Sequence, residues 1–326
     1  MNKKVKILII GFGSIGRRHF NNLVKLGYNN ISFLRSKKSN IETSGLVDYK
    51  VYFNHVEAFK ENPEIVFITN PTSLHMDMAI KAAKNASHIF IEKPISNSLD
   101  SYDELRKLVN EKKIITMVGF QFRFNPILIK LKKMLKNKEL GEVFHINSFY
   151  GEYLPNWHPW EDYKLSYTSN ESLGGGVILT LSHPIDYLIW MFGSVDYIQS
   201  SFSKSNIIET NIEDDLANIT MHFNSGEIAN VHLNYVSRPP KHSLDVYGEK
   251  KSVHIDFLKN SMVCISNEGK VLMEYIESSF NRNDMYLDEV SHFMSSIESN
   301  EKTILPLEVG KKSLKICLSA LERENN

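Results

Sequence analysis

Cysteine is scarce, since the 326-residue sequence holds only Cys264 and Cys317. Two cysteines form neither a disulfide framework nor the paired spacing of a metal site, so we expect reduced core residues and no metal. Long apolar runs are also missing, because none approaches about 18 residues, and the N-terminus shows no signal-peptide pattern. We therefore expect a cytoplasmic protein without a membrane span.

An excess of charge of either sign is absent too. The 38 basic residues balance 38 acidic residues, which gives no reason to expect nucleic acid or an anionic membrane as a partner. A chain of this length can bury a good core and suggests about two domains.

The first motif of the chain follows an apolar run over residues 5–10. This run leads into Gly-x-Gly-x-x-Gly, and helical spacing then continues to Gly27. Gly11 permits a tight turn, Gly13 lets the backbone approach a pyrophosphate, and Gly16 permits close helix packing. The helix N-terminus offers N–H groups to phosphates. This context favours a dinucleotide site over a plain tight turn, and the loop residues are Gly11, Phe12, Gly13, Ser14, Ile15 and Gly16.

The end of the second predicted strand, over residues 30–35, indicates which dinucleotide is bound. An NAD enzyme normally places Asp or Glu about 20 residues after the fingerprint. Here the sequence has Arg35, Ser36, Lys37 and Lys38 instead. A guanidinium, a hydroxyl and two ammonium groups suit a 2'-phosphate, so NADP(H) is favoured and NAD(H) stays open. The alternative is a solvated basic loop.

Strand-like and helix-like segments alternate through the first part of the chain. Strands are predicted over 64–69, 89–91 and 114–118, and helices over 74–83 and 98–112. Ser101 and Glu104 have the spacing of a capping box. Alternation of this kind indicates a parallel sheet wrapped on both faces. We expect residues 1–120 to form an α/β, doubly wound Rossmann domain that binds NAD(P).

The second part of the chain follows another pattern. A helix is predicted over 126–136, a strand over 143–150, an aromatic-rich loop over 151–173 and a helix over 176–191. Alternating strands then turn at 224–226, at Gly248 and at 267–269, and helices close the chain over 284–299 and 306–322. We expect residues 121–326 to form a C-terminal α/β domain with an open, mostly antiparallel sheet.

Lys93 lies at the carboxyl end of a predicted buried strand, within Glu92-Lys93-Pro94. Open parallel sheets bind ligands at this edge, and Pro94 keeps the lysine extended. A partly desolvated lysine can exchange a proton with the oxygen of the carbon that gives up hydride. The alternative is a surface lysine paired with Glu92.

A second candidate stretch opens with Gly174-Gly175-Gly176 and continues into a predicted helix. The glycines would allow close approach of a ligand, and Thr180, His183, Asp186 and Tyr187 recur at helical spacing. A histidine with a carboxylate one turn away is a plausible general base. A satisfied core histidine is the alternative.

The third candidate stretch is the aromatic loop from Tyr153 to Tyr163. It contains Trp157, His158 and Trp160. Aromatic faces beside hydrogen-bonding groups suit a carbohydrate, because sugars present both apolar C–H faces and hydroxyls. The alternative is an Ω-type loop packed on its own aromatic residues.

Together these motifs resemble one family in content and order. They are the glycine fingerprint with His19, Thr69-Asn70-Pro71 with His75, Glu92-Lys93-Pro94, the stretch from Gly119 to Pro126 with Arg123, and the triple-glycine helix. The chain resembles the glucose-fructose oxidoreductase, inositol dehydrogenase and rhizopine-catabolism (Gfo/Idh/MocA) family over nearly its whole length. The resemblance implies a Rossmann domain, an open sheet that often builds a homodimer or homotetramer, and reversible NAD(P)-dependent oxidation of a sugar or cyclitol hydroxyl.

The resemblance also assigns residues. Lys93 matches the family's catalytic lysine, and His183 best matches its catalytic histidine. One position departs from the pattern, because Thr180 stands where the family has an aspartate and the spacing to His183 is one residue shorter. Asp186 is the candidate to orient His183 instead. The aromatic loop and Leu181-Ser182-His183-Pro184 resemble a branch associated with surface-sugar biosynthesis.

We therefore expect an oxidoreductase that transfers hydride between nicotinamide and a hydroxyl or keto carbon of a sugar, cyclitol or nucleotide sugar. The expected catalytic residues are Lys93 and His183. The expected cofactor residues are the fingerprint loop with Arg35, Ser36, Thr69, Asn70, His75, Glu92 and Lys93. The expected substrate residues are Arg123, Trp157, His158, Tyr163, Thr180 and Asp186. The alternatives are a non-catalytic NAD(P)-binding regulator and an interaction protein with a relic fingerprint.

Overall fold

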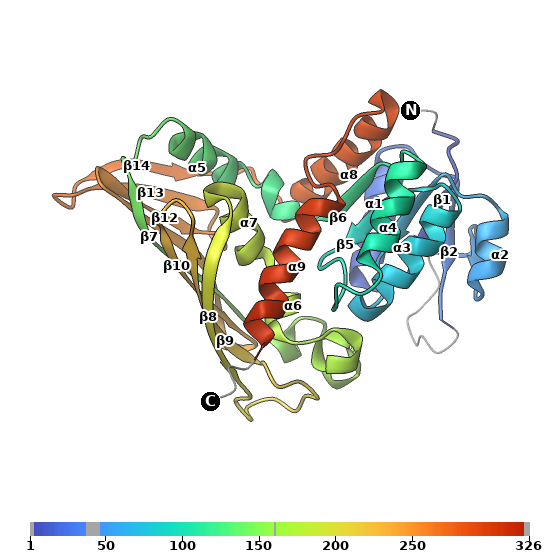
Figure 1. Ribbon diagram of the computed structural model, residues 1–326, viewed down its shortest axis with the longest axis horizontal. Coiled ribbons are helices and arrows are strands. Elements are labelled where there is room, and N and C mark those ends of the chain that lie inside the picture. Colours follow the sequence, from blue (N-terminus) through green and yellow to red (C-terminus); the bar gives the residue numbers. More distant parts are fainter. Residues whose placement is uncertain (1–2, 37–45, 160, 323–326) are drawn as a thin grey trace. The chain divides into compact units, whose positions relative to one another are not determined.

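The computed structural model describes residues 3–36, 46–159 and 161–322 (Figure 1). These residues form two compact units. Unit 1 lies within Met1–Phe120 and Tyr286–Leu314, and unit 2 lies within Gln121–Met285 and the residues from Lys315 onward. The expected boundary after residue 120 coincides with a unit boundary, but residues 286–314 belong to unit 1 rather than to the second domain.

Unit 1 is built on a six-stranded parallel sheet in the order β3-β2-β1-β4-β5-β6. Its strands are β1 (Ile7–Ile10), β2 (Ile31–Leu34), β3 (Lys50–Tyr52), β4 (Ile65–Ile68), β5 (His88–Glu92) and β6 (Thr116–Gly119). Every residue of β1 and β4 is buried, as expected for apolar strands covered on both faces. Strand order reverses between β1 and β4, where sheets of this type bind ligands at the carboxyl edge.

Helices cover this sheet (Figure 1). They are α1 (Ser14–Lys25), α2 (His55–Lys60), η2 (Thr72–Leu74), α3 (His75–Lys84), α4 (Tyr102–Glu111), α8 (Arg282–Ser299) and the first part of α9 (Leu307–Leu321). The capping box expected at α4 is wrong. Ser101 has a left-handed backbone (φ 59°) and makes no side-chain capping hydrogen bond, so its hydroxyl is not aimed at the first turn.

Residues 286–314 join unit 1 through specific contacts. The Phe293 ring lies 5.8 Å from the Phe67 ring and 5.7 Å from the Phe90 ring. The Thr303 hydroxyl donates to the Thr116 carbonyl at 2.7 Å. These contacts complete the core beside β4, β5 and β6. Sequence periodicity could not show them, because the partners are separated by about two hundred residues.

Unit 2 contains an eight-stranded sheet in the order β14-β13-β12-β11-β7-β10-β9-β8. The strands are β7 (Val143–Tyr153), β8 (Val195–Ser203), β9 (Leu216–Phe223), β10 (Ile228–Asn234), β11 (Val236–Gly248), β12 (Lys251–Asp256), β13 (Ser261–Ser266) and β14 (Val271–Ile276). Strands β7 and β10 are parallel and the other pairs are antiparallel. The expected hairpin is confirmed, because β9 and β10 pair around Gly226.

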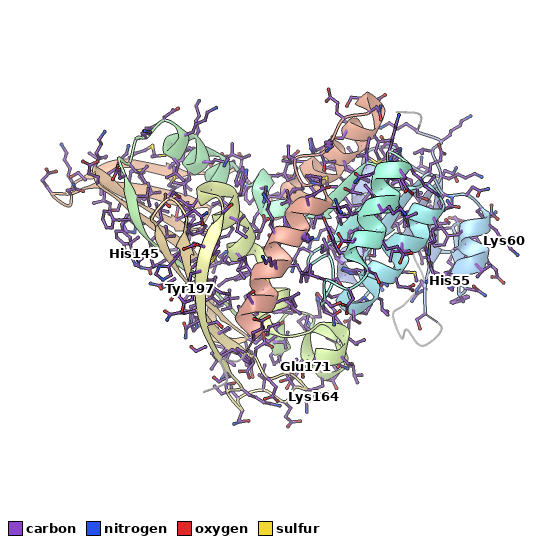
Figure 2. The ribbon with its side chains drawn as sticks, viewed as in Figure 1. His55, Lys60, His145, Lys164, Glu171 and Tyr197 are labelled. Atoms are coloured by element: carbon purple, nitrogen blue, oxygen red, sulfur yellow. The ribbon has the colours of Figure 1, made fainter. Side chains whose placement is uncertain are left out.

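One face of this sheet is apolar and lies against helices α5 (Pro126–Lys136) and α7 (His183–Phe192) (Figure 1). On this face the Ser148 hydroxyl lies 2.6 Å from the Tyr187 hydroxyl. Side chains of the opposite face, such as His145 and Tyr197, point away from α7 (Figure 2). We call this opposite face the open face. Short 3-10 turns complete the unit: η3 (Gln121–Phe124), η4 (Leu154–Asn156), η5 (Tyr163–Leu165), η6 (Tyr167–Ser169) and η7 (Glu171–Leu173).

The single helix expected over residues 176–191 is wrong. The structure has a short α6 (Val177–Thr180) and a separate α7, with Pro184 in the first turn of α7. Proline has no N–H, and its ring clashes with the carbonyl four residues earlier, here that of Thr180. Thr180 is therefore not on the same continuous helical face as His183 and Asp186.

Candidate active site

The predicted site residues fall in both units. The fingerprint loop, Arg35, Ser36, Thr69, Asn70, His75, Glu92 and Lys93 lie in unit 1. Arg123, Trp157, His158, Tyr163, Thr180, His183 and Asp186 lie in unit 2.

The glycine loop of unit 1 connects β1 to α1 in a tight turn. Gly11 has φ +94°, and a Cβ there would lie 2.8 Å from the Asn70 nitrogen. A Cβ on Gly16 would lie 2.6 Å from the Gly11 carbonyl oxygen. Around Gly13, by contrast, a Cβ would meet no heavy atom of the described residues within 4 Å. The loop is crowded where it packs against the sheet and open where a ligand would approach.

The start of α1 fits the pyrophosphate of a dinucleotide. Its N-cap residue is Gly13, and no described side chain caps the helix there. The N–H groups of the first turn and the positive end of the helix dipole therefore point toward the open side of the loop. Exposed Ser14 and half-buried Ile15 begin the helix. The residues present thus suit a bound dinucleotide phosphate.

Two guanidinium groups lie beside the Phe12 ring at the end of β2. The Cζ atoms of Arg35 and Arg17 lie 5.7 Å and 5.2 Å from the ring centroid. Burial, together with the charge of Arg17, lowers the pKa of Arg35. Two neighbouring positive charges suit an anionic group. Ser36 follows as an exposed residue, whereas Lys37 and Lys38 lie outside the described residues.

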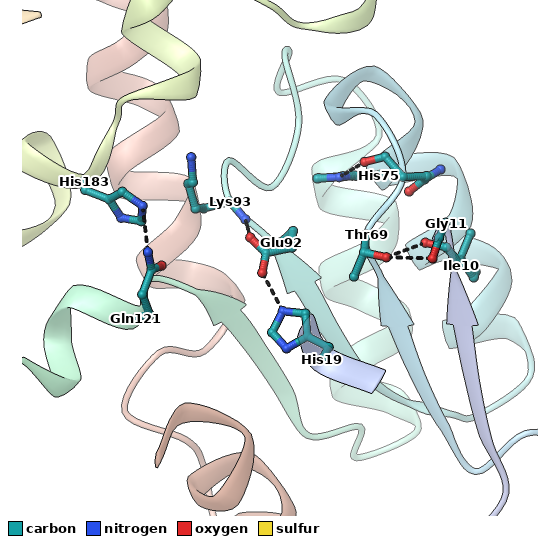
Figure 3. Close-up of polar contacts among 10 residues, drawn as sticks. Ile10, Gly11, His19, Thr69, His75, Glu92, Lys93, Gln121 and His183 are labelled. Atoms are coloured by element: carbon teal, nitrogen blue, oxygen red, sulfur yellow. Dashed lines mark hydrogen bonds and ion pairs between the residues drawn. The ribbon is translucent and has the colours of Figure 1, made fainter. Parts of the chain in front are cut away.

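His75 contacts the backbone just after the carboxyl ends of β4 and β5 (Figure 3). Its Nε2 lies 2.7 Å from the Asn70 carbonyl oxygen, and its Nδ1 lies 2.9 Å from the Pro94 carbonyl oxygen. Burial lowers the pKa of His75, and a neutral imidazole carries a single N–H for these two acceptors. The nearby Thr69 hydroxyl lies 3.0 Å from the Ile10 carbonyl and 3.1 Å from that of Gly11. Both side chains thus hold the β-strand ends in place, and their expected contact with the cofactor stays a prediction.

Glu92 and Lys93 end β5 (Figure 3). Glu92 is buried, with its Oε1 2.6 Å from His19 Nε2, and its Oε2 accepts the backbone N–H of Lys93 at 3.2 Å. The Lys93 side chain is half-buried at the carboxyl edge of the sheet. Unit 1 therefore places an amine where open α/β sheets bind their ligands.

In unit 2, the candidate base His183 begins α7 and is 4% exposed. Its Nε2 lies 3.2 Å from the Gln121 side-chain nitrogen (Figure 3), and its ring lies 4.9 Å from the Phe122 ring. The Gln121 amide donates to this contact when Nε2 carries no proton. Gln121 therefore favours an imidazole whose Nε2 is an acceptor.

Asp186 binds Arg123, a partner that the sequence did not reveal. Its two carboxylate oxygens accept from Arg123 Nε at 2.8 Å and from Arg123 Nη2 at 2.7 Å. Both side chains are buried, with 6% and 1% of their surface exposed. A buried, bidentate ion pair of this kind fixes η3 against α7. That Asp186 also orients His183 stays a prediction.

The triple-glycine turn is crowded by the protein itself. A Cβ on Gly175 would lie 2.6 Å from the Tyr167 and Thr168 carbonyls, and one on Gly176 would lie 2.0 Å from Asp214 Oδ1. The other Asp214 oxygen accepts the Ile178 N–H at 3.0 Å. Gly175 and Gly176 therefore provide room for internal packing, and the approach of a ligand at this turn stays a prediction.

Asp214 is a functional candidate that sequence reasoning missed. It is 5% exposed, and burial raises its pKa to about 7, although the hydrogen bond from Ile178 lowers it. The sequence places it within Glu213-Asp214-Asp215. Nothing in such an acidic run distinguishes the buried member, so only the fold identifies it. Arg17, Gln121 and the His19–Glu92 contact were missed as well, because only the fold shows what each side chain contacts.

The aromatic loop is partly packed on its own unit. The Trp157 ring meets the Tyr235 ring edge-on at 5.3 Å, and the Tyr163 hydroxyl accepts the Glu209 N–H at 3.3 Å. The buried Tyr235 hydroxyl donates to the Gly176 carbonyl at 3.1 Å. His158 is half-buried beside Trp157, and Trp160 lies outside the described residues. The loop thus connects to the glycine turn through Tyr235.

Two family models match the chain. Residues 5–120 match an oxidoreductase family model described as an NAD-binding Rossmann fold, and residues 128–254 match the Gfo/Idh/MocA C-terminal domain. Scyllo-inositol 2-dehydrogenase (NAD(+)) of Bacillus subtilis is 25% identical over 321 residues, which cover 94% of this chain and 90% of that protein.

Solved structures share the fold. Levoglucosan dehydrogenase in complex with NADH and levoglucosan superposes with a TM-score of 0.83 at 16% identity, covering 97% of this chain and 96% of that one. UDP-N-acetylglucosamine 3-dehydrogenase of Acidithiobacillus ferrooxidans gives a TM-score of 0.77 at 18% identity, with the same coverage of 97% and 96%.

Within residues 3–36, 46–159 and 161–322, no group of three or more His, Cys, Asp and Glu side chains is arranged to hold a metal ion. Among the helices of the same residues, none has the length and apolarity needed to cross a membrane. The Rossmann sheet, the fingerprint turn and the mixed sheet of unit 2 agree with both family matches. The chain belongs to the Gfo/Idh/MocA family of oxidoreductases.

Proposed function

We propose that this oxidoreductase uses NADP(H) to transfer hydride to or from a hydroxyl or keto carbon of a sugar, cyclitol or nucleotide sugar. The observation that carries the proposal is the placement of Lys93 at the carboxyl end of β5, on the same sheet edge as the open glycine turn before α1. Ligands of open α/β sheets bind along this edge.

The choice of NADP(H) rests on Arg35 and Arg17. Bound NADP(H) gives or takes a hydride at its nicotinamide ring. In NADP(H) the adenosine ribose carries a phosphate, and an arginine at the end of β2 is a common partner for it. Here two guanidinium groups share the Phe12 ring. An acidic partner for the ribose hydroxyls, typical of NAD enzymes, is replaced at this position by Arg35.

Lys93 is the proposed carrier of the substrate hydroxyl proton. A lysine amine in a partly desolvated site can act as a general acid or base. His183 is proposed as a second acid–base group, with Gln121 holding its Nε2. Arg123 and Asp186 are proposed to fix α7 rather than to bind substrate, because the two buried side chains bind each other.

The substrate class is proposed from the aromatic loop and from the relatives. Trp157, His158 and Tyr163 offer aromatic faces and polar groups that suit a sugar ring. The matched proteins are named for inositol, levoglucosan and UDP-N-acetylglucosamine. We infer a sugar or cyclitol, and the loop's resemblance to a surface-sugar branch favours a nucleotide sugar. Both cysteines are buried free thiols, which supports a cytoplasmic location.

We further propose that the open face of the unit 2 sheet joins two copies of the chain. It holds a shallow depression of about 420 Å³ lined by residues such as Phe149, His232 and Lys241. Lys241 and Asp245 lie four residues apart on β11. A twofold axis that lies in the interface and crosses β11 near Ser243 would bring each lysine opposite the aspartate of the other copy. A homodimer or homotetramer is the expected assembly.

A non-catalytic regulator that binds NAD(P) is the second candidate. Thr180 replaces the aspartate that the family pattern leads us to expect, and this replacement favours the regulator. The presence of Lys93 and His183 favours a catalytic oxidoreductase over the regulator.

The experiment that separates these candidates uses the purified full chain. NADPH and NADH are titrated by fluorescence, and a panel of sugars, cyclitols and nucleotide sugars is then tested with NADP+ for absorbance of the reduced cofactor. We expect tighter binding of NADPH and reduction with one substrate class. Tight binding without turnover on any substrate would favour the regulator.

Lys93→Met tests the proposed base. Turnover should fall about 10²-fold or more while the NADPH dissociation constant stays within a few-fold, because the amine acts on the substrate proton. Lys84→Met, on the exposed end of α3, is the matched control. Unchanged turnover in the Lys93 variant would remove this role.

A further inference from the structure

A buried histidine connects the fingerprint helix to the strand that carries Lys93. His19 lies on α1, one turn after Gly16, and its side chain has no exposed surface. Its ring lies 4.8 Å from the Phe90 ring and 5.6 Å from the Phe67 ring. These aromatic neighbours hold the imidazole in one place.

The histidine and a glycine together fix the Glu92 carboxylate. His19 Nε2 lies 2.6 Å from Glu92 Oε1, and a Cβ on Gly119 would lie only 2.9 Å from the same oxygen. The second oxygen, Oε2, accepts the Lys93 N–H at 3.2 Å. Glu92 therefore touches His19 on one side and the backbone of Lys93 on the other (Figure 3).

The second nitrogen of His19 indicates where the proton lies. Among the described residues, buried Nδ1 has no hydrogen-bond partner. A buried N–H without an acceptor is costly, whereas a lone pair there costs less. The Nε2–H tautomer, which donates to Glu92, is therefore the favoured form.

We propose that His19 and Glu92 form a positioning pair that couples helix α1 to the backbone of Lys93. The N-terminal end of α1 receives the dinucleotide phosphates, and His19 is part of the same rigid helix. When α1 shifts, the imidazole moves with it and displaces the Glu92 carboxylate. The hydrogen bond from the Lys93 amide to that carboxylate then changes. Neither residue needs to touch the reacting atoms. The inference rests on the proposed function, because it gives Lys93 its importance.

Three variants test the pair. His19→Phe fills the aromatic space without a donor, His19→Met is a second donor-free variant if the first does not fold, and His19→Gln keeps an N–H near the place of Nε2. The first readout is hydrogen exchange of the Lys93 amide in the protein without cofactor. Pro94 has no N–H, so a short proteolytic peptide around Lys93 contains few other amides that could exchange. It should exchange about tenfold faster in the donor-free variants and within about threefold of wild type in the glutamine variant.

The second readout is steady-state kinetics. The donor-free variants should lower kcat about tenfold or more, leave the substrate KM within about threefold, and be rescued by glutamine. Lys93 amide exchange that stays at the wild-type rate in the donor-free variants overturns the pair, whatever the activity. Faster exchange in a protein that turns over no substrate supports the pair and removes the proposed function instead.

Discussion

At the scale of single residues, cofactor preference depends on the guanidinium beside Phe12. Arg35→Ala should raise the NADPH dissociation constant about tenfold or more, because a hydrogen bond to a charged group contributes about 1.5–3 kcal/mol. The NADH constant should stay within about threefold, since NADH has no 2'-phosphate. Fluorescence titrations with both cofactors measure this difference. Arg106→Ala, on exposed α4, is the control, and equal losses for both cofactors would contradict the assignment.

Another single residue should make unit 2 sensitive to acid. His242 stacks on Tyr150 with ring centroids 3.9 Å apart, and among the described residues its buried Nε2 has no hydrogen-bond partner. Burial, with a smaller effect of the Arg282 charge, lowers the pKa of His242 well below its usual range. In the unfolded chain this histidine binds a proton below about pH 6.5, whereas in the folded unit it stays neutral. The free energy of unfolding therefore falls as pH drops below about 6.5.

His242→Phe should remove part of that acid sensitivity. Melting temperatures at pH 7.5 and 5.5 should differ less in this variant than in wild type. Other histidines of unit 2 with a lowered pKa, such as His232, keep their contribution. Tryptophan fluorescence reports on this unit, because all three tryptophans lie between residues 121 and 285. Exposed His55 (Figure 2), changed to Gln, is the control. The same pH response in the phenylalanine variant would refute this origin.

Residue roles were predictable where the backbone dictates them. Gly11 and Gly16 have the crowded surroundings that the fingerprint implies, and the structure confirms that part of the prediction. The roles were not predictable where the partner comes from another element. Asp186 binds Arg123, which is 63 residues away, so helical spacing around Asp186 could not reveal it.

At the scale of elements, the glycine turn before α6 should tolerate no side chain. Gly176 and Gly193 have similar φ angles, +99° and +93°, but only Gly176 is crowded by Asp214. Gly193→Ala should cost about 1–3 kcal/mol from backbone strain alone. Gly176→Ala should cost at least about 2 kcal/mol more, because Asp214 must leave its hydrogen bond to Ile178. Urea unfolding followed by tryptophan fluorescence compares the two, and equal costs would contradict the crowding.

Most elements could be predicted from local pattern. The helix expected over 126–136 is α5 with the same bounds, and the alternating apolar positions of β9 and β10 correctly gave a hairpin. The continuous helix over 176–191 failed because apolar spacing outweighed Pro184 in the interpretation. The Ser101 cap failed because a capping sequence does not fix the backbone angle that the cap requires.

At the scale of the whole molecule, association through the open face should depend on charge. Lys241→Glu should shift the protein toward monomer, because like charges would then meet across the twofold axis. Adding Asp245→Lys to that variant should restore association, because the attraction returns with its signs exchanged. Light scattering after size-exclusion chromatography measures the mass of each form. A monomeric wild type, or a single variant that associates as wild type does, would rule out this interface.

The return of residues 286–314 to unit 1 has a consequence for synthesis on the ribosome. When the first 120 residues emerge, Phe67 and Phe90 lack their contact with Phe293. Thr116 lacks its hydrogen bond from Thr303. About 190 further residues must follow, which takes roughly 10 to 40 seconds at usual elongation rates. Unit 1 is thus begun first but is completed only after residues 121–285 of unit 2 have been made. During that interval the nascent chain exposes an apolar patch that a chaperone can cover, and a ribosome that stalls within unit 2 leaves unit 1 unfinished.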